Sequence, residues 1–190
     1  FGLMHGATEQ TGARDVTSWA VFLGSLGVSF VGLVALESSQ VFGGRSGNRM
    51  LSLPYMIAVG MGLHNLGEGL AIGASYASGE YTLSALLVAG FGLHNGTEGF
   101  GIVGAAGKTP MSWRDVFLLG LIAGLPTCVG TFLSGQGVSS YFSICFYALA
   151  AGSLLYVVLS LTVMSYTATR RVQVAAGMFA GISLMYVTAM

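Results

Sequence analysis

Six long apolar runs take up almost the whole chain and constrain its fold more than any other feature. They cover approximately residues 18–41, 52–77, 82–106, 115–134, 141–165 and 172–190. About 20 mostly apolar residues are enough for a helix to cross the hydrocarbon core of a bilayer. Only 7% of the 190 residues are charged, against about a quarter in an ordinary soluble domain. The sequence therefore predicts an all-α, polytopic transmembrane helix bundle.

The links between these runs are short, and their charges alternate. The links after the first, third and fifth runs carry six of the seven basic residues: Arg45, Arg49, Lys108, Arg114, Arg170 and Arg171. The other two links carry no Lys or Arg. The positive-inside rule places the basic links in the cytoplasm. We therefore expect both termini outside, residues 1–17 as an extracytoplasmic segment, and a location in the plasma or inner membrane of the cell.

Glycine is abundant, with 30 copies, and some copies are spaced for helix packing. Gly120 with Gly124, and Gly177 with Gly181, form small-xxx-small pairs, which let two helices approach closely in lipid. We expect helix contacts at these pairs.

One eight-residue pattern occurs twice. It reads G-L-H-N-x-x-E-G and covers residues 62–69 in the second run and 92–99 in the third. Each histidine lies about 12 residues into its run, which is near mid-membrane at about 1.5 Å rise per residue. In a helix, the His and Glu of each copy share a face at i and i+4, and the Asn adjoins it. Each helix therefore offers an imidazole nitrogen, an amide oxygen and a carboxylate close together.

Antiparallel packing of the second and third runs would bring the two copies together at equal depth. Such a pseudo-twofold site near the midplane is a recurring plan among transporters. An ionisable side chain at the bilayer centre costs about 2.5–3.5 kcal/mol or more. Because neither run contains Lys or Arg, a divalent cation would best compensate the carboxylates. A purely structural His–Glu contact and a proton relay without metal remain as alternatives.

The two motifs resemble those of a known family. The segments H-N-L-G-E-G-L-A-I-G (64–73) and H-N-G-T-E-G (94–99) are similar to the paired metal-binding motifs of the ZIP (Zrt-, Irt-like protein) family, which imports zinc, iron, manganese or cadmium. The resemblance implies a binuclear site bridged by the two glutamates, with these ligands: His64, Asn65, Glu68, His94, Asn95 and Glu98. It also implies an eight-helix fold of which six helices are visible. We therefore expect the chain to be truncated upstream of Phe1.

We predict a metal transporter rather than an enzyme. The substrate is expected to be a divalent ion, with Zn²⁺ first and Cd²⁺, Fe²⁺ or Mn²⁺ next, because imidazole with carboxylate suits these metals better than calcium or magnesium. The expected partners are metal ions and the lipid bilayer, without nucleic acid, and a homodimer is an assembly that we consider. A membrane-embedded metalloenzyme and a relative that binds metal without moving it are the alternatives.

Glu37 is the remaining acidic residue within an apolar run. It lies near the expected cytoplasmic end of the first run, beside Ser38, Ser39 and Gln40. Two interpretations stay open: a carboxylate in contact with interfacial water, or a relay or exit ligand for the metal.

Overall fold

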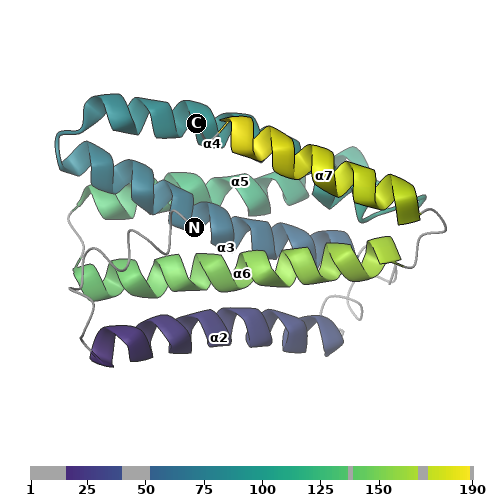
Figure 1. Cartoon of the computed structure of the whole chain (residues 1–190), viewed down its shortest axis with the longest axis horizontal. Helices are drawn as coiled ribbons and strands as arrows, with labels where there is room; N and C mark the ends of the chain where they lie inside the picture. Colours follow the sequence, from purple (N-terminus) through teal and green to yellow (C-terminus); the bar gives the residue numbers. More distant parts are fainter. Residues whose placement is uncertain (1–15, 40–51, 137–138, 167–170, 189–190) are drawn as a thin grey trace.

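The computed structural model describes residues 16–39, 52–136, 139–166 and 171–188 (Figure 1). Within these residues the chain forms six α-helices and no strand. The helices are α2 (Val16–Ser38), α3 (Ser52–Ala77), α4 (Tyr81–Gly104), α5 (Trp113–Gly135), α6 (Ser140–Tyr166) and α7 (Arg171–Thr188). The six predicted helices are therefore confirmed, with ends that agree to within about three residues. Most of the predicted segment 1–17 and the basic link 43–50 lie outside the described residues.

Among the described residues, three helices are long and apolar enough to cross a membrane: α2, α5 and the Ser140–Ser165 part of α6. The apolar part of α7, Val172–Ser183, is shorter. With 26 and 24 residues, α3 and α4 would be about 39 and 36 Å long at 1.5 Å per residue, but they also carry the polar motifs. The described residues thus form an all-helical membrane bundle. Crossing of the bilayer by α3, α4 and α7 stays a prediction.

The central helix of the bundle is α3. It packs against α4, α5 and α6, whereas α2 packs mainly against α6 (Figure 1). A tight turn at Ser78–Glu80 joins α3 to α4, and Gly79 takes a positive φ of 80° there, a conformation that glycine adopts without strain. The turn makes α3 and α4 antiparallel neighbours. The two motif-bearing helices are therefore adjacent, as the sequence predicted.

The apolar core lies where α3 meets α5 and α6. Its fully buried members include Met56 and Ile57 from α3, Leu119 from α5, and Tyr156 and Val157 from α6. The ends of α3 and α5 are also tied together, because Tyr55 donates a hydrogen bond to Asp115 Oδ1 at 3.0 Å. Asp115 completes a capping box with Ser112 at the start of α5. These contacts fix α5 alongside α3.

Glycine allows α3 and α5 to come into backbone contact, but at other positions than we expected. A Cβ atom added at Gly69 would overlap the backbone of Thr127, and one at Gly130 would overlap the Leu66 carbonyl. The predicted contacts at the two small-xxx-small pairs are wrong within the described residues. Nothing there lies within 4 Å of a Cβ added at any of the four: Gly120, Gly124, Gly177 and Gly181. Those glycines face outward.

Candidate metal centre

Glu68 on α3 meets the motif of α4. Its Oε1 lies 2.5 Å from Nε2 of His94, and its Oε2 accepts a hydrogen bond from Nδ2 of Asn95 at 2.9 Å. His64, one turn earlier on α3, places its Nε2 3.5 Å from the same Oε1. One carboxylate therefore links residues from both copies of the pattern.

Glu98 completes the cluster from α4. Its Oε1 lies 4.0 Å from Nε2 of His64 and 4.0 Å from Nε2 of His94. The nitrogen or oxygen ligand atoms that His64, Glu68 and His94 offer all lie within 4.8 Å of one another. Asn95 contacts Glu68, and Asn65 lies beside Glu98. The structure thus brings all six predicted ligand residues close together. Their role as ligands stays a prediction.

Within the cluster, Glu68 of α3 is more deeply buried than the motif residues of α4. The Glu68 side chain is only 2% exposed, while the side chains of His94 and Glu98 are 18% and 16% exposed. The cause is the position of α4 at the edge of the bundle: among its residues, only Ser84 and Ile102 are buried. A buried carboxylate therefore sits behind two partly accessible groups.

Asn65, the sixth predicted ligand, is held by a different helix. Its Nδ2 donates a buried hydrogen bond to the backbone carbonyl of Ala123 on α5, at 3.1 Å. Its amide also lies beside the Glu98 carboxylate. This contact with α5 was not among the predictions from the sequence. No sequence signal identifies this contact, because its partner is a backbone carbonyl and Pro126 of α5 releases the carbonyl of Ile122 rather than that of Ala123.

Several oxygen atoms of the motif residues have no hydrogen-bond partner. Three of the buried, unpaired side-chain atoms among the described residues belong to this group: Asn65 Oδ1, Asn95 Oδ1 and Glu98 Oε2. A buried polar atom without a partner costs about 1–3 kcal/mol. Amide and carboxylate oxygens carry lone pairs that bind cations, and an imidazole nitrogen does so when it is not protonated. The donor set therefore fits a metal ion.

The spacing of the donor atoms also fits a metal ion. Two ligand atoms at about 2.1 Å from a tetrahedral zinc stand roughly 3.4 Å apart. The 3.5 Å between His64 Nε2 and Glu68 Oε1 matches this spacing, and the 4.0 Å distances to Glu98 are slightly longer. The shorter His94–Glu68 contact is a direct hydrogen bond, so a bound ion would have to move these two groups apart.

Glu37 lies on another helix, near the end of α2. Its side chain is exposed, and its Oε2 accepts a hydrogen bond from Ser160 Oγ on α6 at 3.4 Å. These contacts do not decide between the two interpretations of Glu37 given above.

The chain is similar in sequence to a curated human protein, zinc transporter ZIP4. The two are 34% identical over 131 residues, which make up 67% of this chain and 20% of the human protein. The chain therefore spans about a fifth of the length of that relative. No protein-family model matches the chain, and no solved structure matches it.

Proposed function

We propose that the chain belongs to the ZIP family and transports a divalent metal ion across the membrane, with zinc as the first candidate. The convergence of two copies of one motif on a single buried cluster is the observation that carries the proposal. The partial similarity to human zinc transporter ZIP4 supports the same conclusion.

The first ion would bind where both histidines meet both glutamates. Nε2 of each histidine and Oε1 of each glutamate supply two nitrogens and two oxygens. Four such ligands suit zinc and its first-row neighbours. The two carboxylates would also balance the charge of a divalent ion, since α3 and α4 contain no Lys or Arg.

A second ion would bind on the asparagine side of the cluster. Glu68 directs Oε1 toward the histidines and Oε2 toward Asn95, so its two oxygens serve different neighbours. Glu98 has the same capacity, because its Oε2 is buried and unpaired. We therefore retain the binuclear arrangement, in which both glutamates bridge and Asn65 and Asn95 add amide oxygens.

Transport would run from outside into the cytoplasm, through the cell membrane. The ion would lose most of its water as it passes from outside into the cluster. Release would follow a rearrangement of the helices that hold the ligands. Protons compete with metals for the same lone pairs, so protonation of the carboxylates would favour release.

Metal uptake by proteoliposomes tests the proposal. The purified chain would be reconstituted with a zinc-sensitive dye inside the vesicles, and Zn²⁺ would be added outside. We expect uptake by the parent, and loss of uptake in Glu68→Gln, which keeps the shape of the side chain but removes a charge. Glu80→Gln is the matched control, because Glu80 is an exposed carboxylate in the α3–α4 turn. Parental uptake by the Glu68 variant would overturn the proposal.

A further inference from the structure

The two ring nitrogens of His64 lie in different surroundings. Nε2 faces the carboxylates, 3.5 Å from Oε1 of Glu68 and 4.0 Å from Oε1 of Glu98. Nδ1 is buried, and the backbone of Ala150 on α6 interacts with the ring. Because the N–H of Ala150 is used inside α6, the group that can interact with the ring is its carbonyl. The imidazole therefore lies between two carboxylates and one backbone carbonyl.

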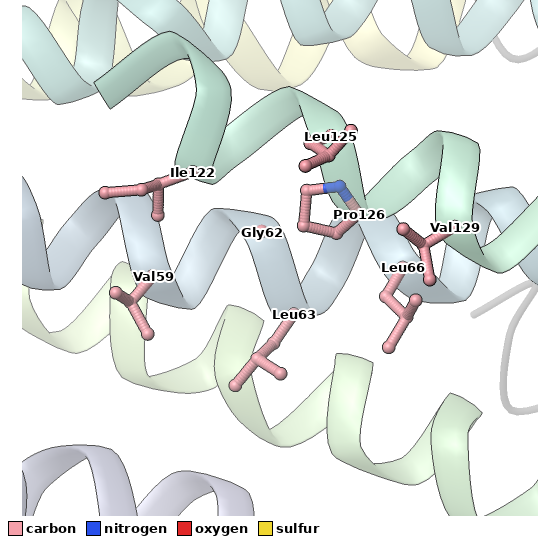
Figure 2. Close-up of a pocket in the computed structure, with 8 residues that line it drawn as sticks. All are labelled: Val59, Gly62, Leu63, Leu66, Ile122, Leu125, Pro126 and Val129. Atoms are coloured by element: carbon pink, nitrogen blue, oxygen red, sulfur yellow. The ribbon is translucent and has the colours of Figure 1, made fainter. Parts of the chain in front are cut away.

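The neighbouring helix α5 offers this imidazole no side chain in the groove that it forms with α3. Figure 2 shows this groove, of about 360 Å³, where Gly62 of α3 lies beside Pro126 of α5. All the side chains that line it are apolar: Val59, Leu63, Leu66, Ile122, Leu125, Pro126 and Val129. None of these side chains can accept a hydrogen bond, so α6 is the helix that can serve Nδ1.

The two sides of the His64 ring favour different tautomers. A neutral imidazole carries its hydrogen on one nitrogen and a lone pair on the other. The carboxylates favour the hydrogen on Nε2, which leaves no lone pair there for a metal. The Ala150 carbonyl favours the hydrogen on Nδ1, which leaves the Nε2 lone pair free. Metal-binding histidines generally depend on such an acceptor at the other nitrogen.

A second donor competes for the Ala150 carbonyl. Oγ of Ser153 donates to this oxygen at 2.9 Å, and Ser153 is fully buried. The oxygen also accepts the helical N–H from four residues later, so both of its lone pairs are in use. This competition explains why Nδ1 of His64 makes no hydrogen bond of good geometry, although the carbonyl is close to the ring.

The backbone of α6 is fixed at this point by contacts on both sides. On one side, Ser29 of α2 donates to the Leu149 carbonyl at 2.7 Å, and a Cβ atom added at Gly152 would overlap the backbone of α2. On the other side, a Cβ atom added at Gly67 of α3 would lie 2.6 Å from Cβ of Ala150. The Ala150 carbonyl therefore has little room to move, and the Ser153 hydroxyl decides how available it is.

We propose that Ser153 restrains metal binding at His64, because its hydroxyl competes with Nδ1–H for the Ala150 carbonyl and so disfavours the tautomer with a free Nε2. Ser153 is then a positioning residue that touches no ion, and its removal should tighten metal binding. The inference rests on the proposed metal site and adds a residue outside both copies of the motif.

Zinc titration and nitrogen NMR of the purified full chain test the inference. The chain has 3 histidines, and after isotope labelling their nitrogen shifts report which ring nitrogen carries the hydrogen. We expect Ser153→Ala to shift His64 toward the Nδ1–H tautomer in the metal-free chain. It should also tighten Zn²⁺ binding by about 2- to 10-fold, the range of one net hydrogen bond.

Ser75→Ala is the matched control. Ser75 on α3 is also buried, and its Oγ donates to the carbonyl three residues earlier, that of Ile72, at 2.8 Å. The substitution removes the same kind of hydrogen bond away from His64, so neither the nitrogen shifts nor the zinc affinity should change.

The outcomes separate this inference from the proposed function. A parent chain that binds no zinc overturns both. A parent that binds zinc through Nδ1 of His64 overturns only the inference. A Ser153→Ala variant with parental nitrogen shifts, or with unchanged or weaker zinc binding, also overturns only the inference. If Ser153→Ala does not fold, Ser153→Cys provides the same readout, because a thiol is a weaker donor of similar size.

Discussion

At the scale of single residues, Glu68 makes the contacts that hold the cluster together. It is nearly fully buried, and its two oxygens contact both His94 and Asn95 from the opposite helix. Glu98 approaches the same histidines from α4 but is less enclosed. Two carboxylates that close to each other repel unless a positive charge lies between them. A shared cation is therefore expected to couple the two residues strongly.

The coupling can be measured with single and double substitutions. We expect Glu68→Ala and Glu98→Ala each to weaken Zn²⁺ binding by more than about 10-fold, because either loss leaves the ion short of a negative ligand. The double variant should bind only slightly worse than either single variant, since both residues serve one site. Isothermal titration calorimetry on purified protein would measure the affinities. Effects that add in full would mean that the two carboxylates act at separate sites.

Much of this cluster could be predicted from spacing alone. His64 and Glu68 share a helical face because of the four-residue interval, and a short link makes α3 and α4 antiparallel. The contact of Asn65 with Ala123 could not be predicted in this way. Its partner is a backbone atom, which every residue has, and the face that α3 turns toward α5 depends on packing rather than on the motif.

At the scale of helices, the α3–α5 contact is built on backbone proximity. Gly130 packs against the Leu66 carbonyl, and Gly69 packs against the backbone of Thr127. Lipid tails are as apolar as side chains, so close packing is a main source of attraction between helices in a membrane. The same pairing carries Asn65 to Ala123. Loss of this packing should therefore affect both stability and the site.

A pair of glycine substitutions on α5 tests this packing. Gly130→Ala should destabilise the protein by about 1–3 kcal/mol, because the new methyl group would overlap backbone atoms that cannot yield easily. Gly120→Ala is the matched control: it lies on the same helix, and its Cβ would meet open space. Because both changes replace Gly with Ala within one helix, they alter helix propensity equally. The difference between their unfolding midpoints therefore reports the effect of packing. Thermal unfolding in detergent would measure it, and equal midpoints would contradict the packing role.

The helices themselves followed from the sequence, whereas the faces on which they meet did not. Runs of about 20 apolar residues between short links left little freedom in where helices begin and end. Small-xxx-small spacing is less informative in a chain with 30 glycines, because many pairs satisfy it by chance. Gly120 and Gly124 have the spacing but face outward, while Gly130 makes the contact.

At the scale of the whole molecule, the most buried polar motif residues lie on the central helix. The central helix α3 carries three polar motif residues, which are buried. Three of the helices around it, α2, α5 and α6, are long and apolar enough to cross a bilayer by themselves. Polar residues within a membrane are tolerated when they face the bundle interior. This arrangement supports the view that α3 and α4 cross the membrane despite their motifs.

Accessible cysteines at the two ends of α4 test that view together with the orientation of the protein. Lys108 and Glu80 are both exposed and lie beyond opposite ends of the helix. At about 1.5 Å per residue, α4 is about 36 Å long, slightly more than the roughly 30 Å hydrocarbon core. The positive-inside rule places Lys108 in the cytoplasm and Glu80 outside.

The experiment uses a background without the two native cysteines, because Cys128 is exposed and Cys145 is half-buried. In that background, Glu80→Cys should react with a membrane-impermeant maleimide added to intact cells, and Lys108→Cys should react only after the cells are opened. Zn²⁺ uptake by the background would serve as the control for native structure. Labelling of both positions from outside would mean that α4 does not cross the membrane. Labelling of Lys108→Cys in intact cells, and of Glu80→Cys only in opened cells, would mean that α4 crosses with the opposite orientation. The basic links would then not determine the orientation of this protein.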